Sequence, residues 1–155
     1  MESNQPLGYM LGRSLRVYKN QFAAELKSRQ AALTFEQCVI LHLLSANDNV
    51  IQQDLAKHMQ KDKSIIVRQI NGLLEGHYVE RLTNKEDKRK KNLRLTDAGY
   101  EILNEMKKIA NEVTQKLLTD VKEKELEVFR TVMEKIQKNG LIEDELFRCD
   151  LMNKK

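Results

Sequence analysis

The sequence is poor in the residues that interrupt helices or form covalent cross-links. It has one proline, Pro6, no tryptophan, and only 5% aromatic residues in 155. Its two cysteines, Cys38 and Cys149, are too few for the disulfide framework of a small secreted domain. No apolar run approaches the ~20 residues of a membrane-spanning helix, and the N-terminus lacks the basic and apolar regions of a signal peptide. These absences predict a cytoplasmic protein without a membrane partner.

The abundant residues favour a mainly helical protein with a core of its own. Hydrophobic residues make up 41% of the chain and charged residues 32%. A chain of this length usually forms one domain. Leu, Lys and Glu, the most frequent residues, favour helices, and almost no proline is present to end them.

Positive charge is concentrated in the middle of the chain. Residues 57–94 hold eleven basic and five acidic side chains, a net charge of +6, within a chain whose total is +4. The remaining residues therefore carry a net charge of −2. A basic centre between slightly acidic arms indicates contact with a polyanion rather than general surface solubility.

Apolar residues at steps of three or four residues predict several amphipathic helices. The first helix carries Leu7, Leu11, Leu15, Tyr18, Phe22 and Leu26 on one face. A second helix starts after Thr34, whose hydroxyl can form a capping box with Gln37. Thr96 caps a fifth helix, a sixth runs over about 122–138, and a short one is expected over 141–151.

Two short helices in the basic region predict a helix-turn-helix. They span about 52–59 and 62–76, with Asp62 as the N-cap of the second helix. Ile66, Ile70, Leu73 and Leu74 share the face expected to pack inward. The opposite face carries side chains that suit base edges in a major groove: Lys63, Ser64, Val67, Arg68 and Asn71.

A β-hairpin is expected next, with strands over 78–83 and 92–95 and a polar loop over 84–91. Asp87 can pair with Arg89 and stiffen the loop. Four consecutive cations repel one another unless phosphates lie near them: Lys88, Arg89, Lys90 and Lys91. A narrow minor groove, with its enhanced negative potential, would accept Arg89.

These motifs together resemble the MarR family of winged-helix regulators over nearly the whole chain. The matching segments are Leu33–Gln37, Asp54–Ala56, Gly76–Arg81, the Asp-x-Arg-x-Lys pattern of Asp87, Arg89 and Lys91, and Leu95-Thr96-Asp97-Ala98-Gly99. The resemblance implies a mainly α fold with a small β-wing, a homodimer, and two recognition helices that enter successive major grooves of a palindromic site. It also implies that the wings reach the flanking minor grooves.

The resemblance defines one domain over 1–155, with a DNA-binding lobe at 34–96 and dimerisation helices at 5–31 and 97–155. A dimer is also expected because the apolar stripes of the outer helices exceed what the lobe needs for its core. We therefore expect a duplex-DNA-binding transcriptional repressor, without a cofactor, that a small-molecule effector releases. Leu15, Tyr18 and His42 are the expected lining of the effector pocket.

Two alternatives remain at the level of sequence. Cys38 and His42 are four residues apart on one helix and could bind a metal, although the fifth helix offers no third Cys or His ligand. A buried core cysteine and no metal site is the favoured interpretation. The basic wing could instead contact an acidic protein. No catalytic motif is present, so an enzyme is not expected.

Overall fold

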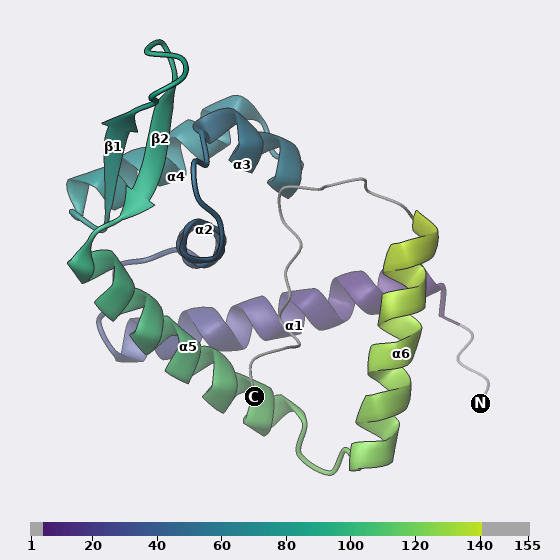
Figure 1. Ribbon diagram of the computed structural model, residues 1–155. Coiled ribbons are helices and arrows are strands. Elements are labelled where there is room, and N and C mark those ends of the chain that lie inside the picture. The colour runs from purple at the N-terminus through teal and green to yellow at the C-terminus, as the bar shows by residue number, and fades with distance from the viewer. Residues whose placement is uncertain (1–4, 141–155) are drawn as a thin grey trace.

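The computed structural model describes residues 5–140 of the chain. Its helices and strands follow the order predicted from the sequence, in a mainly helical fold with one two-stranded antiparallel sheet (Figure 1). The elements are α1 (Leu7–Ser28), α2 (Phe35–Ala46), α3 (Gln52–Met59), α4 (Lys63–Glu75), β1 (Val79–Thr83), β2 (Lys91–Leu95), α5 (Asp97–Leu117) and α6 (Glu123–Gly140).

Three sequence-based details differ from the structure or fall outside it. Both strands end where the sequence predicts, but their starts differ by one residue. Strand β1 begins one residue later, at Val79, and β2 begins one residue earlier, at Lys91. Asp62 is the N-cap residue of α4, but its side chain makes no capping hydrogen bond. The predicted helix over 141–151 lies outside the described residues.

Helix α2 forms the centre of a winged lobe, which we define as residues 35–95. Figure 1 shows it end-on, with α3, α4 and the sheet on one side and α1 crossing on the other. Its start is fixed by the predicted capping box: Thr34 Oγ1 accepts from the Gln37 main-chain N–H, and Gln37 Oε1 accepts from that of Thr34. The core around it is buried and aliphatic: Ile40, Leu41, Leu43, Leu44, Val50, Leu55, Ile66, Ile70, Leu73, Val79, Leu93, Leu95 and Leu103.

A second apolar cluster joins α1 to α5 and to the start of α2. Phe22, Leu26, Met106, Ile109 and Val113 are buried in it. The Phe22 and Phe35 rings meet edge to face with centroids 5.7 Å apart, a favourable aromatic geometry. An ion pair between Arg29, at the C-terminal end of α1, and Glu112 of α5 also joins these two helices. The apolar residues in the C-terminal half of α1 are therefore covered by other helices of the same chain.

The remaining apolar stripes stay uncovered within the described residues. Leu7 and Leu15 of α1 are 57% and 52% exposed, and Phe129 of α6 is 56% exposed. No residue of α6 is buried. None of the helices between residues 5 and 140 combines the length and apolar character needed to cross a bilayer.

The segment from Leu95 to Gly99 closes the wing onto α5 through close main-chain contacts. Thr96 Oγ1 donates to the His77 carbonyl at 2.7 Å and accepts from the Gly99 N–H at 3.0 Å. An ideal Cβ on Gly99 would lie 2.1 Å from the Tyr78 carbonyl oxygen. Only glycine therefore fits where α5 begins against the turn that precedes β1.

Replacing this glycine tests the packing of the junction. Gly99→Ala should lower the free energy of unfolding by about 1–3 kcal/mol, the usual cost of overpacking, because the opposing atom belongs to the main chain. Chemical denaturation monitored by circular dichroism measures the change. Ala98→Ser, at the exposed neighbouring position, should stay within about 0.5 kcal/mol. Equal stability of Gly99→Ala and the unmodified protein would contradict the proposed contact.

Candidate nucleic-acid interface

Helix α4 has a buried face and an exposed face, as its sequence predicts. Ile66, Ile70 and Leu73 are fully buried against the core of the lobe, and Leu74 packs at its edge. On the opposite face, Lys63, Ser64, Arg68 and Asn71 are exposed and Val67 is half-buried. The structure thus places the five candidate reading residues on one outward surface.

A tight turn joins α3 to α4. Gln60 ends α3 in the left-handed conformation, with φ 49° and ψ 43°, a geometry that lets the main chain reverse after a helix. The Lys61 N–H then donates to the Ala56 carbonyl at 3.2 Å. Helices α3 and α4 are consequently packed as a helix-turn-helix, with α4 in the position of the second, reading helix.

The tip of the wing is held by its own side chains. Asn84 Oδ1 accepts from the main-chain N–H groups of Glu86 and Asp87 at 2.8 and 3.0 Å. Asp87 Oδ1 accepts from the Arg89 main-chain N–H at 3.0 Å and lies 3.4 Å from Arg89 Nε. This confirms the predicted Asp87–Arg89 pair. The Arg89 side chain nevertheless remains 93% exposed, so its charge is open to a ligand.

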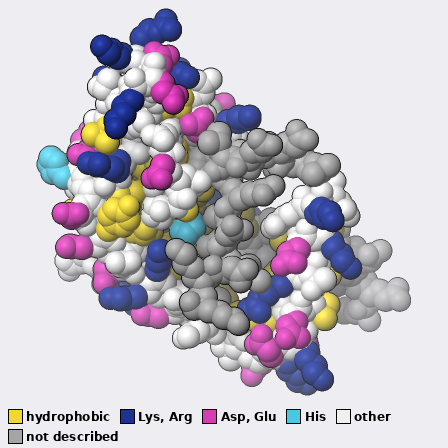
Figure 2. Space-filling model, viewed as in Figure 1, with side chains coloured by type: hydrophobic (Ala, Val, Ile, Leu, Met, Phe, Trp, Pro, Cys, Tyr) yellow, Lys and Arg dark blue, Asp and Glu magenta, His cyan; other side chains and the backbone are white. Residues whose placement is uncertain are grey.

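The other predicted wing residues lie on either side of this pair. Lys88 and Lys90 are exposed at the tip, and the Lys90 N–H donates to the Asp87 carbonyl at 2.9 Å. Lys91 belongs to β2 rather than the loop, and its Nζ donates to Thr83 Oγ1 at 2.9 Å. Figure 2 shows dark blue cationic side chains at the wing end of the molecule. The charge excess found in the sequence is therefore displayed at one extremity.

The base of the wing is tied to the segment between α2 and α3. Asn92 Oδ1 accepts from Asn84 Nδ2 at 2.9 Å, and Asn92 Nδ2 donates to Asn49 Oδ1 at 3.2 Å. The Leu93 N–H donates to the Val50 carbonyl at 2.8 Å. The wing therefore has a fixed orientation relative to the helix-turn-helix.

Sequence reasoning missed Arg81 as part of this surface. Arg81 Nη2 donates to Asn71 Oδ1 at 3.4 Å, which links β1 to the outward face of α4. Together with Lys63, Lys91 and Gln52, it lines a cleft of about 300 Å³ between the helices and the wing. Strand alternation offered a signal, because Arg81 is two residues from buried Val79 and so lies on the strand face toward the helices.

Cys38 and His42, the pair that the sequence offers for a metal, both lie on α2. Cys38 is buried, and burial raises the pKa of its thiol to about 12. Burial, with a contribution from the charge of Lys107, lowers the pKa of His42. Within residues 5–140, no cluster of three or more His, Cys, Asp or Glu side chains could hold a metal ion.

The three residues expected to line an effector pocket do not share one described cavity. Leu15 is exposed, His42 is half-buried, and the Tyr18 ring packs against the rings of Phe22 and Phe35. Their role as a ligand site stays a prediction.

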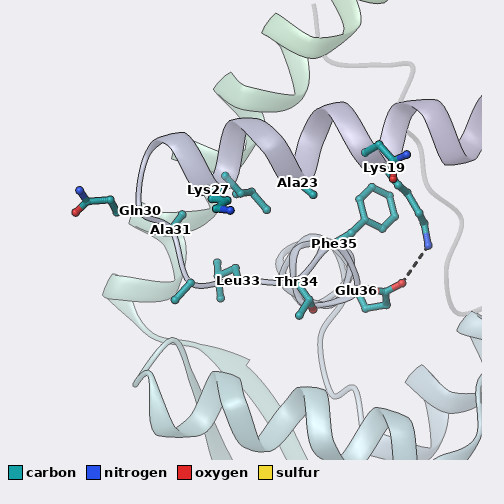
Figure 3. A pocket seen from close by; sticks show the side chains of 12 residues that line it. Lys19, Ala23, Lys27, Gln30, Ala31, Leu33, Thr34, Phe35 and Glu36 are labelled. Atoms are coloured by element: carbon teal, nitrogen blue, oxygen red, sulfur yellow. Dashed lines mark hydrogen bonds and ion pairs between the residues drawn. The ribbon is translucent and has the colours of Figure 1, made fainter.

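A different cavity, of about 620 Å³, lies between α1 and the start of α2. Ala23, Ala31, Leu33 and Phe35 contribute apolar lining (Figure 3). At its edge, Lys19 Nζ lies 3.0 Å from Glu36 Oε1 and 4.7 Å from the centre of the Phe35 ring. Burial raises the pKa of Glu36, but the hydrogen bond and charge of Lys19, a main-chain hydrogen bond and Lys61 outweigh it, so that the pKa is lowered.

The family model described as the MarR family matches residues 33–91. A crystal structure of MarR superposes with a TM-score of 0.81 at 26% sequence identity, covering 90% of this chain and 94% of the other. A MarR transcriptional regulator from Methanosarcina mazei Go1 superposes with a TM-score of 0.77 at 23% identity, over 86% and 95% of the two chains.

A third similar structure is a Mycobacterium tuberculosis MarR family protein in complex with salicylic acid. It has a TM-score of 0.71 and 21% identity, over 88% of this chain and 100% of that chain. The family match covers the helix-turn-helix and most of the wing, and the structural matches extend over the outer helices. The chain therefore carries a MarR family domain over residues 33–91 and has the winged-helix fold of MarR transcriptional regulators.

Proposed function

We propose that this chain is a sequence-specific regulator that binds duplex DNA as a homodimer and represses transcription by occupying a palindromic promoter site. The rigid wing next to the exposed face of α4 is the observation that carries this proposal. Phosphate contacts supply affinity and position, and base contacts in the major groove supply specificity. The two surfaces correspond to these two tasks.

The wing is suited to affinity because its cations are exposed and its main chain is already ordered. The contacts that Asn84 and Asp87 make with the tip remain in place without DNA, so little conformational entropy is lost on binding. Arg89 is the side chain we assign to the minor groove. Lys88, Lys90 and Lys91 are assigned to neighbouring phosphates.

Helix α4 is suited to reading because its outward side chains match base edges. Arg68 can bind guanine or a phosphate, Asn71 can bind adenine, and the Val67 methyl groups can contact a thymine methyl. Ser64 and Lys63 extend the surface toward the N-terminal end of the helix. The Arg81 contact restricts Asn71 before DNA arrives.

We assign the uncovered faces of α1 and α6 to dimerisation. Leu7, Leu15, Phe129 and Val132 are between 47% and 57% exposed, and apolar patches of this kind mark interaction surfaces. A second copy of the chain would cover these faces and would also supply a second recognition helix. Two such helices are needed because one helix makes few base contacts.

Effector control is the final part of the proposal. A salicylic acid complex of a protein with the same fold supports a small aromatic acid as the ligand class. The cavity between α1 and α2 has a volume within the usual range for small-molecule sites. A ligand there can release DNA only if it binds more tightly when the winged lobes of the two copies are in their DNA-free arrangement.

Arg89→Ala tests the wing. The affinity for every duplex should fall, and the slope of log affinity against log salt concentration should flatten by about 0.9, the contribution of one phosphate contact. Gel shifts at several salt concentrations measure both quantities. Lys108→Ala removes an equal charge from an exposed site on α5 and should leave the slope unchanged. Unchanged affinity of Arg89→Ala at moderate salt would refute the wing assignment.

Arg68→Ala tests the reading face. We first select the preferred duplex from a random library with the unmodified protein. The variant should lose about 1–3 kcal/mol of binding free energy on that duplex and little on random DNA, since a bidentate base contact is removed. Arg68→Lys keeps the charge but not the fork geometry, so it should also lose preference. An equal loss on all duplexes would show a phosphate contact only.

The same selection separates DNA regulation from the alternative of an acidic protein partner. If the unmodified protein shows no preference among duplexes at any salt concentration, the regulator proposal fails. Binding to an acidic protein would then be the remaining function of the basic wing.

Phe129→Glu tests dimerisation. The unmodified protein should sediment at twice the chain mass of 18.1 kDa, whereas the variant should shift toward the monomer because a charge is placed in the apolar contact. Thr131→Glu adds the same charge to the opposite side of α6, about 200° away around the helix, and should remain dimeric. A monomeric unmodified protein would contradict the proposal directly.

A further inference from the structure

Two polar side chains are buried within the described part of the chain, and they meet each other. Gln37 of α2 is 7% exposed and Gln69 of α4 is 9% exposed. The other side chains around them are mostly aliphatic. Buried polar groups need hydrogen-bond partners, so their presence in a core restricts how its elements can be arranged.

A closed set of hydrogen bonds connects these two residues with Thr34. Gln37 Nε2 donates to the Gln69 main-chain carbonyl at 3.2 Å, and Thr34 Oγ1 donates to Gln69 Oε1 at 2.9 Å. The capping box already joins Thr34 to Gln37. The start of α2 is therefore bonded to both the main chain and the side chain of one residue in the middle of α4.

Gly72 is an independent sign that this arrangement is tightly fitted. An ideal Cβ at this position would lie 2.5 Å from Gln37 Nε2. Glycine in a helix interior is otherwise unfavourable relative to alanine. The absence of a side chain at position 72 leaves the space through which Gln37 reaches α4.

We propose that Thr34, Gln37 and Gln69 are positioning residues that fix the rotation and height of the recognition helix. This rests on the proposed function, in which the outward face of α4 reads DNA. The aliphatic contacts beneath α4 are non-directional, so by themselves they restrain rotation or sliding weakly. Hydrogen bonds lose strength steeply with angle and distance, and these ones hold the residue next to Arg68.

The outer end of this network reaches the cavity between α1 and α2. Thr34 lines that cavity, between Leu33 and Phe35 (Figure 3). Its hydroxyl simultaneously caps α2 and donates to Gln69. Any displacement of Thr34 at the cavity wall therefore changes a contact of the recognition helix.

Gln37→Glu is the most selective variant for testing the proposal. A glutamate at this position keeps the capping box with Thr34 but replaces the donor to the Gln69 carbonyl with an acceptor. Gly72→Ala disturbs the same bond from α4 by displacing Gln37 Nε2. Both variants should reduce the ratio of affinities for the selected duplex and random DNA at least tenfold. The salt dependence should stay unchanged because the wing is intact.

A second measurement does not depend on DNA. Amide hydrogen exchange over Lys63–Glu75 should become at least several-fold faster in Gln37→Glu, while exchange in α5 stays as in the unmodified protein. Gly72→Ala is judged on duplex preference, because the higher helix propensity of alanine opposes faster exchange in α4. Thr34→Ser, which retains the hydroxyl, should preserve both the exchange pattern and the duplex preference. If the unmodified protein prefers no duplex, the proposed function fails, and hydrogen exchange still decides the positioning role.

Val113→Ala provides the control for a general loss of stability. Val113 is buried between α1 and α5, outside the cluster that contains α4. It should destabilise the fold while retaining duplex preference, and any faster exchange should affect α4 and α5 alike, because both then exchange through global unfolding. The proposal is overturned if Gln37→Glu and Gly72→Ala behave as the unmodified protein. It is equally overturned if Val113→Ala reproduces their loss of preference, or if its faster exchange is confined to α4.

Discussion

Burial of the apolar face of α4 against α2 is the constraint on which the rest of the structure depends. Ile66, Ile70 and Leu73 are fully buried, and each contributes roughly 1.5–3 kcal/mol by leaving water. This burial determines which side of α4 faces outward. It also places Gln69 beside Gln37, where the directional hydrogen bonds of the lobe form.

The wing continues from this core and takes its orientation from it. Val79, Leu93 and Leu95 anchor the two strands in the same cluster as α4. Hydrogen bonds of Asn92 with Asn84 and Asn49 then connect the loop of the wing to the segment between α2 and α3. The cations of the wing are thus held on a main chain that is bonded to the core of the lobe. In the proposed function this separates the charged surface from the surface that reads bases.

The lobe also shares contacts with the helices that hold it. Phe35 packs its ring against Tyr18 and Phe22 of α1, while the adjacent Thr34 bonds to α4. The start of α2 is therefore a point where the outer helices and the recognition helix meet. If the proposed ligand and DNA sites are occupied as we infer, the start of α2 is an element with contacts to both.

Local chemistry in the sequence determined most of the elements and the outward face of α4. The Thr34 and Thr96 caps, the spacing of apolar residues and the Asp87–Arg89 pair depend on neighbours within a few positions, and the structure confirms them. Tertiary structure decided what depends on distant partners. The Gln37–Gln69 bonds and the fit of Gly99 against Tyr78 join separate elements, and no local periodicity encodes them. Strand alternation indicates the face on which Arg81 lies, but its contact with Asn71 depends on the packing of α4. The apolar stripes of α1 and α6 look alike in sequence, yet only packing showed that half of one is covered and that no residue of the other is buried.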